Sequence, residues 1–398
     1  MAKRTISQIQ IRHANWLTRL SLKAEMQKLS SIQTTATESL SACAIKYTTG
    51  RDNNFNLIRF LASILVLVSH SFSIVLGKGE VEPIKNTIGM SGGHIAVDIF
   101  FITSGFLITG SYFARGNILT FIWSRILRIY PALVVAMIFS VFILGLYFTT
   151  NTPQEYFSHF QTREYFLKNI FLFFGVNHYL PGVFANVPYE GAINDSLWTL
   201  PYEVKMYALL AIILTLVIQL ERRLNIAIVK ASLLLIGIAA LAANLINYFY
   251  PFTSPHFIRL FFMFFIGAGF YVWRDHIYLS SKLFYVISAI LLVSALHPKL
   301  LYVTYTLFLP YFVFYISYVP AGRIREFNKI GDYSYGIYIY AFPIQQSVAA
   351  TMPGVSLITL MLVAFGITFL LAFMSWHIVE KNFLKMKTFT LWSKNKDT

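Results

Sequence analysis

Long apolar runs separated by short polar segments dominate the sequence from about residue 55 to residue 380. Most of these runs approach the length of about 20 residues that an α-helix needs to cross the hydrocarbon core of a bilayer. Ten such runs occur, at about 56–76, 95–113, 130–149, 197–219, 226–248, 257–273, 281–297, 300–319, 333–350 and 356–378. The pattern predicts an all-α polytopic membrane protein with about ten transmembrane helices.

The composition agrees with this prediction, since 57% of the 398 residues are hydrophobic and only 12% are charged. The formal net charge of +15 does not indicate nucleic-acid binding, because the basic residues lie between apolar runs and are not clustered on a soluble module. Cys43 is the only cysteine, so neither a disulfide framework nor a cysteine-ligated metal site is available. We expect no metal and no tightly bound cofactor.

The distribution of Lys and Arg predicts the orientation in the membrane. Alternate connections between the runs carry most of these residues, as does the end of the chain, and such segments face the cytoplasm under the positive-inside rule. Both termini are then expected in the cytoplasm. An additional apolar and aromatic segment at 165–181 is too short to span and is expected to be interfacial or re-entrant.

The chain divides into three parts by composition. Residues 1–50 contain seven Lys or Arg and two Glu, and we expect a basic cytoplasmic extension, either a tail or an amphipathic helix on anionic lipid. Residues 51–388 form the transmembrane domain, and residues 389–398 a short cytoplasmic tail. The long outside connection at about 150–195 is either a functional surface or an ordinary connector.

Two ionisable residues share the first apolar run. Arg59 and His70 are eleven residues apart, which is close to a whole number of helical turns, so both side chains point to one face about 16 Å apart along the axis. Ionisable groups within a spanning helix are costly and usually mark a path or a site. His70 is therefore a candidate general base, with a buried structural histidine as the alternative.

The second run offers possible supporting residues. His94 and Asp98 lie one turn apart, so the carboxylate could orient the imidazole, although a structural role is equally compatible with the spacing. Ser104 precedes Gly105, and small residues at this position favour close helix packing.

Two further clusters carry charge. Arg125 and Arg128 are three residues apart at a cytoplasmic helix end, a placement that suits the phosphates of a nucleotide-containing donor or simply sets the topology. Glu203 lies inside the fourth run with Tyr207 one turn later, which makes it a candidate wall of a polar cavity. The alternative for Glu203 is an ion pair that holds helices together.

Taken in order, these motifs resemble the acyltransferase-3 family of integral membrane O-acyltransferases, which modify bacterial exopolysaccharides, O-antigens and related glycans. The resemblance covers about residues 51–388. It rests on Arg59 with His70, the segment 97–108, Arg125 with Arg128, and the segments 197–203, 333–338 and 375–380.

The resemblance implies an enzyme that moves an acyl group, acetyl most commonly and sometimes succinyl, from cytoplasmic acyl-CoA to a hydroxyl of an envelope polysaccharide or lipid-linked sugar. It implies that His70 is the essential histidine and Arg59 its motif partner, that Arg125 and Arg128 contact the donor, and that Glu203 is a family carboxylate. It also implies the bacterial inner membrane as the location. Many members carry a histidine where this chain has Ala341, so catalysis here cannot depend on that position.

Two other classes of protein remain compatible with the residues alone. A non-catalytic transporter of a small solute or glycan precursor would use Arg59, His70, Asp98 and Glu203 as a polar path. A glycan polymerase or ligase of the envelope would need a lipid-linked sugar and no thioester. The sequence does not indicate the oligomeric state.

Overall fold

The structure, a computed structural model, describes residues 38–43, 52–77 and 82–388, and most of them are helical. The predicted basic extension at 1–50 lies almost wholly outside the described residues, and the predicted tail at 389–398 lies wholly outside them. Each of the ten apolar runs contains a helix. The ten helices are α3 (Phe55–Leu76), α5 (Gly92–Arg115), α6 (Ile118–Ile138), α10 (Leu200–Leu224), α11 (Val229–Phe249), α12 (Pro255–Val272), α13 (Ser281–Ser294), α14 (Pro298–Tyr318), α16 (Ser334–Thr351) and α17 (Leu357–Met374).

Eight helical segments in the described part of the chain are long and apolar enough to cross a membrane. Several are extended by a further turn of different geometry. α6 continues through the π-helix η1 (Phe139–Gly145) into α7 (Leu146–Phe148), the 3-10 helix η2 (Asp195–Thr199) leads into α10, and α17 continues through the π-helix η4 (Ser375–Glu380) into α18 (Lys381–Lys385). The prediction of an all-α polytopic membrane protein is confirmed.

Two of the ten helices fall short of that criterion for different reasons. α13 has only 14 residues, about 21 Å of helix. α16 has 18 residues but contains three tyrosines and two glutamines, and nearly all of its side chains are buried inside the protein. The sequence of α16 is therefore suited to contact with protein on all sides and not to contact with lipid.

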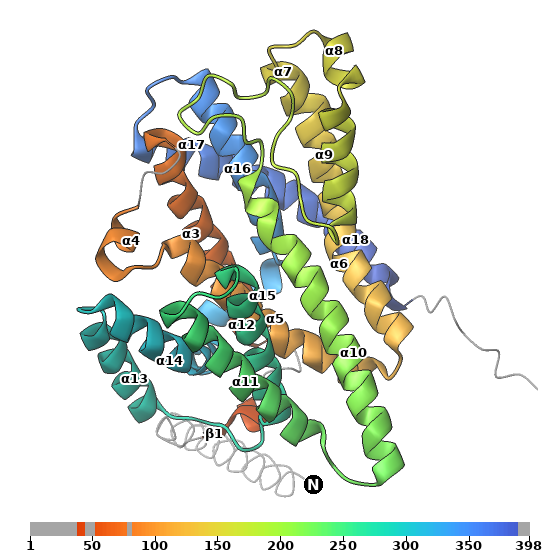
Figure 1. Cartoon of the computed structure of the whole chain (residues 1–398), viewed down its shortest axis with the longest axis vertical. Coiled ribbons are helices and arrows are strands. Elements are labelled where there is room, and N and C mark those ends of the chain that lie inside the picture. The colour runs from red at the N-terminus through yellow and green to blue at the C-terminus, as the bar shows by residue number, and fades with distance from the viewer. Residues whose placement is uncertain (1–37, 44–51, 78–81, 389–398) are drawn as a thin grey trace, which may run out of the picture.

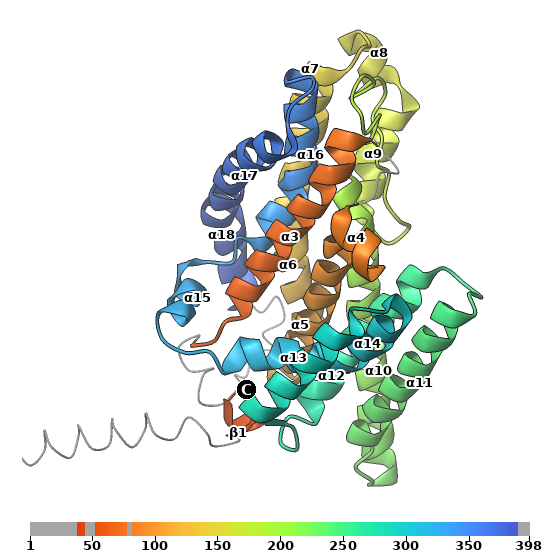
Figure 2. The same ribbon diagram turned by 90° about the vertical axis from the view of Figure 1, so that its left-hand side faces the viewer.

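Glycines set the closest helix contact, between α5 and α12. A Cβ atom on Gly105 of α5 would collide with the carbonyl oxygen of Phe264, and one on Gly267 of α12 would collide with the carbonyl oxygen of Ile102. The two backbones can approach this closely only because neither residue has a side chain. Around this contact, α11, α12, α13 and α14 gather on one side of α5 (Figures 1 and 2).

α16 packs between α3 and α17 (Figure 2) and also contacts the long connection between α7 and α10. The side-chain amide of Gln345 donates hydrogen bonds to the carbonyl of Leu67 on α3 at 2.8 Å and to the Ser71 hydroxyl. The amide of Gln346 donates to the carbonyls of Tyr189 and Ala192, both at 2.7 Å. These bonds satisfy backbone groups of an irregular segment that would otherwise be buried without partners.

The connection between α7 and η2 begins with two helices, α8 (Pro153–Ser158) and α9 (Phe160–Phe171), of which α9 lies beside α6 (Figure 1). α9 has 12 residues, too few to cross a bilayer, in agreement with the expectation of a non-spanning segment at 165–181. The remaining elements are short. They are α4 (Pro83–Ile88), η3 (Arg323–Glu326), α15 (Phe327–Ile330), η5 (Met386–Thr388) and the antiparallel pair β1 (Glu38–Ser39) and β2 (Tyr278–Leu279).

We predict that Gly267→Val destabilises the protein, because the new side chain must push α12 away from α5, and overpacking of this kind costs about 1–3 kcal/mol or more. Thermal unfolding in detergent should show a lower midpoint for this variant. Gly366→Val on α17 is the matched control, since a Cβ at Gly366 meets nothing within 4 Å. Equal midpoints for the two variants would contradict the packing argument.

Candidate functional site

A cavity of about 120 Å³ lies where α3, α5, α6, α10 and α16 meet. Six of the residues singled out in the sequence contribute to its wall, although they come from four different helices. These six are Arg59, Ser104, Arg125, Arg128, Glu203 and Tyr207. The fold thus brings together the predicted cationic residues of the first apolar run and of α6 with the predicted carboxylate of the fourth run.

Two of the three arginines converge on one carboxylate. Asp332 lies immediately before α16, and its Oδ2 atom forms an ion pair with Arg128 and accepts a second contact from Arg59 Nη1 at 3.6 Å. Burial disfavours the charged form of Asp332, but the guanidinium groups of Arg128 and Arg59 and hydrogen bonds from Ser334 hold the pKa of this carboxyl well below its usual range. Asp332 is therefore a fixed negative charge that holds two arginines of the cavity wall.

A second carboxylate supports Arg128 from another helix. Glu380 Oε2 lies 3.5 Å from Arg128 Nη1, and its Oε1 accepts a hydrogen bond from the Ser375 hydroxyl at 3.0 Å. Ser375 and Glu380 are five residues apart, the spacing that a π-helical turn brings onto one face, and both lie in η4. The change in helical geometry at η4 places this carboxylate beside Arg128.

Arg125 has a different environment. Its Nε donates a hydrogen bond to the Ser124 hydroxyl at 3.1 Å, and its guanidinium lies 6.0 Å from the ring centroid of Tyr207. Tyr207 in turn donates a hydrogen bond to Glu203, its neighbour one turn earlier on α10. Within the described residues, Arg125 forms no ion pair, so its positive charge is the least compensated of the three.

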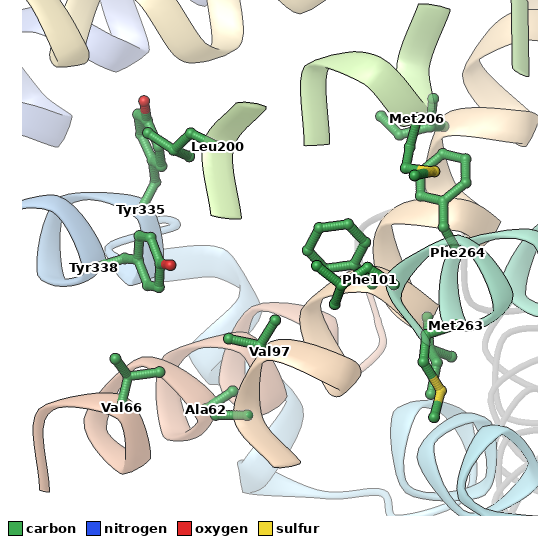
Figure 3. Packing of buried hydrophobic residues seen from close by; sticks show 14 of the residues in the cluster. Ala62, Val66, Val97, Phe101, Leu200, Met206, Met263, Phe264, Tyr335 and Tyr338 are labelled. Atoms are coloured by element: carbon green, nitrogen blue, oxygen red, sulfur yellow. The ribbon is translucent and has the colours of Figure 1, made fainter. Parts of the chain in front are cut away.

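Aromatic side chains complete the cavity. Tyr335 and Tyr338 project from α16 toward Leu200, while Val97 and Phe101 of α5 lie on the facing side (Figure 3). The Tyr335 hydroxyl donates a hydrogen bond to the carbonyl of Ile129 at 2.9 Å. The wall therefore combines apolar rings with a few charged groups, as ligand pockets commonly do.

His70 is not part of this wall. Its half-buried ring packs edge-on against Phe342, with ring centroids 5.1 Å apart. Phe342 follows the cavity residue Tyr338 by one turn of α16, and Tyr338 donates to the Ser196 carbonyl and shares a hydrogen bond with Thr199. Along α3, His70 therefore lies outside the cavity, and the hydrogen bonds of Tyr338 separate the two.

The environment of His70 includes residues of the long connection between α7 and α10. The ring of Tyr189 lies 5.5 Å from that of Phe342, and the Tyr189 hydroxyl donates to Asp195 at 2.6 Å. His178 Nδ1 lies 3.0 Å from the other carboxylate oxygen of Asp195. Burial, followed by the hydrogen bond to Asp195, raises the pKa of the Tyr189 hydroxyl.

The structure does not pair Asp98 with His94, as the one-turn spacing suggested. Asp98 is buried and forms an ion pair with Arg259 of α12 at 3.1 Å, and it accepts a hydrogen bond from the Tyr305 hydroxyl at 3.0 Å. The ring of His94 lies 6.3 Å from that of His256. These residues link α5 to α12 and α14 and lie outside the wall of the cavity.

Three charged residues of this region were not assigned a role from the sequence. Arg259 lies inside an apolar run and could have been flagged on that ground alone. Asp332 and Glu380 stand at the ends of runs, where an acidic residue is unremarkable, so only the folded arrangement reveals their contacts with Arg128. The described residues contain no group of three His, Cys, Asp or Glu that could hold a metal ion.

Comparison with known proteins identifies the relationship. The acyltransferase domain family matches residues 52–377. The chain is 30% identical over 346 residues to a protein of Shigella phage Sf6 named O-acetyl transferase, an alignment that covers 84% of this chain and 96% of that protein.

A second relative is Nodulation protein 10 of Rhizobium leguminosarum bv. viciae, with 27% identity over 371 residues, 86% of this chain and 96% of that protein. No solved structure matches the chain significantly. The family match covers most of the chain and includes the residues that build the cavity. This chain therefore belongs to the acyltransferase-3 family and is an integral membrane acyltransferase.

Proposed function

We propose that this enzyme transfers an acetyl group from cytoplasmic acetyl-CoA to a hydroxyl of an envelope carbohydrate, either a cell-surface polysaccharide or a lipid-linked sugar. The observation that carries the proposal is the cavity that gathers Arg59, Arg125 and Arg128 with Glu203 inside a membrane-spanning bundle. Cationic groups of this kind suit a donor that bears phosphates. The name of the phage Sf6 relative supports acetyl as the transferred group.

In the proposed reaction, His70 accepts the proton of the acceptor hydroxyl as its oxygen attacks the thioester carbonyl. The carbon–sulfur bond breaks as the new carbon–oxygen bond forms, and the proton ends on the thiolate of the released CoA. In the alternative, the imidazole itself attacks the thioester carbonyl and releases CoA, and the acceptor hydroxyl then attacks the acyl-histidine and releases the free imidazole. The half-buried position of His70 beside the outer connection supports a meeting point with a carbohydrate acceptor.

The orientation that we propose places both termini in the cytoplasm of a bacterium and the enzyme in its inner membrane. The ends of α5 and α10 and the starts of α6 and α13 then face inward with their basic residues. Arg125 and Arg128 lie not at the end of α6, as the sequence suggested, but seven and ten residues beyond its inward-facing start at Ile118, so a donor that enters from the cytoplasmic side would reach them about 10–15 Å along the helix.

The orientation predicts opposite accessibility for two exposed positions. In a Cys43→Ser background, Glu190→Cys should react with a membrane-impermeant maleimide in intact spheroplasts, whereas Lys282→Cys should react only after lysis. Both side chains are exposed, so burial does not explain a difference. The reverse labelling pattern would place the termini outside.

His70→Gln should lower the turnover number by about 10²–10⁴-fold, because an amide keeps hydrogen bonding but cannot accept the proton. The measurement is thiol release from acetyl-CoA by the enzyme in proteoliposomes with a carbohydrate acceptor. His276→Gln, which alters an exposed histidine away from the cavity, is the control. Wild-type turnover in a correctly inserted His70→Gln protein would remove the base assignment.

Cells that express the enzyme should carry an acetyl increment of about 42 Da on an envelope glycan that is missing from cells without it, a mass that follows from the ester formed in acyl transfer. Mass spectrometry of isolated polysaccharide and of lipid-linked sugars separates the two acceptor classes. A different mass increment would correct the acyl group, and unchanged glycans in both fractions would contradict the acceptor.

A further inference from the structure

The three arginines of the cavity differ in how their charge is compensated. Arg128 contacts Asp332 with one terminal nitrogen and Glu380 with the other, and Arg59 contacts the same oxygen of Asp332. Arg125 forms no ion pair with any residue that the structure describes. The side chains of Asp332 and Glu380 are only 10% and 2% exposed, so these ion pairs are shielded from solvent.

This difference limits what Arg128 can do. If Arg128 turned to bind a phosphate, the Asp332 and Glu380 carboxylates would remain buried without their main counter-ion, which is strongly unfavourable. Arg125 can meet an anion at no such cost. Because Arg125 precedes Arg128 by three residues, it also lies about 4.5 Å nearer the start of α6, the end that faces the cytoplasm in the proposed orientation.

Arg59 has a feature of another kind. Its Nε–H is buried, and no hydrogen-bond acceptor for it occurs in the described part of the chain. Arg59 lines the cavity, so a ligand oxygen entering there is the available acceptor. The contact of Asp332 with Arg59 Nη1 limits the movement of this guanidinium.

We propose that Asp332 is a positioning residue that divides the arginines between two parts of the donor. Arg125 meets the phosphates of the nucleotide, whereas Arg128 and Arg59, fixed by Asp332, form the wall along the uncharged thioester arm. This inference rests on the proposed acyl-CoA donor and refines it, since it gives the two arginines of α6 different roles.

The test compares two thioester donors, acetyl-CoA and acetyl-pantetheine, which lacks the nucleotide. Arg125→Gln should raise KM about tenfold for acetyl-CoA, the loss expected for one charge-assisted hydrogen bond, with kcat unchanged and with no effect on KM for acetyl-pantetheine. Inhibition by adenosine 3′,5′-bisphosphate should weaken by a similar factor. Arg323→Gln, which removes an exposed charge at a distance from the cavity, is the matched control.

Arg128→Gln and Asp332→Asn should instead lower kcat by the same factor for both donors and leave inhibition by the bisphosphate unchanged. Asp332→Glu should recover part of the lost kcat, because it restores a carboxylate that can reach the guanidinium groups. If either neutral variant fails to insert, the double variant Arg128→Gln with Asp332→Asn removes both charges of the pair and is compared in the same way.

Two results would overturn the inference. One is a selective rise of the acetyl-CoA KM in Arg128→Gln, equal to that in Arg125→Gln, and the other is wild-type kcat in Asp332→Asn with both donors. A failure of the proposed function would look different, because the wild-type protein itself would then release no thiol from acetyl-CoA and would not bind the bisphosphate.

Discussion

The compensation of buried guanidinium groups is the constraint on which the rest of the structure depends. An arginine inside a membrane-spanning bundle is tolerated only when carboxylates or other polar groups surround it. Here Asp332 serves both Arg59 and Arg128, Glu380 adds a second contact to Arg128, and Asp98 holds Arg259 at another point of the bundle. These ion pairs connect helices that are far apart in the sequence, so the same contacts that make the charges tolerable also fix how the helices meet.

α16 shows how this constraint reaches the whole bundle. Asp332 stands just before its first turn, and Tyr335 and Tyr338 follow on the cavity side. Gln345 binds α3, and Gln346 binds the long connection between α7 and α10. A helix of this composition would be poorly suited to cross the bilayer in direct contact with lipid. Surrounded by α3, α17 and the irregular segment before η2, it has acceptors for the hydroxyls of Tyr335 and Tyr338 and for the amide nitrogens of both glutamines, and it joins Asp332 to the tyrosines of the cavity wall.

The sequence predicted the helices well, because apolar runs of bilayer length are the strongest signal a chain can carry. It also selected Arg59, Arg125, Arg128 and Glu203, since charges within or beside such runs are conspicuous. It did not predict that Asp98 would pair with Arg259, because one-turn spacing suggests a local partner and gives no information about a partner 161 positions away. Asp332 and Glu380 escaped notice for the same reason, as their importance arises from contacts with α6.

The formal charges around the cavity sum to zero, with three positive charges from Arg59, Arg125 and Arg128 and three negative ones from Glu203, Asp332 and Glu380. Asp332 and Glu380 are paired with Arg59 and Arg128, whereas Arg125 and Glu203 form no ion pair within the described residues, so Arg125 is the guanidinium left for an anionic ligand group. An interior of this kind is suited to a ligand with one charged end and a long uncharged arm. The 16 Å between Arg59 and His70 along α3 matches such an arm better than a compact ligand. Tyr338, which is hydrogen-bonded to Ser196 and Thr199 of η2, is the side chain that the arm of the proposed donor would pass on its way to His70.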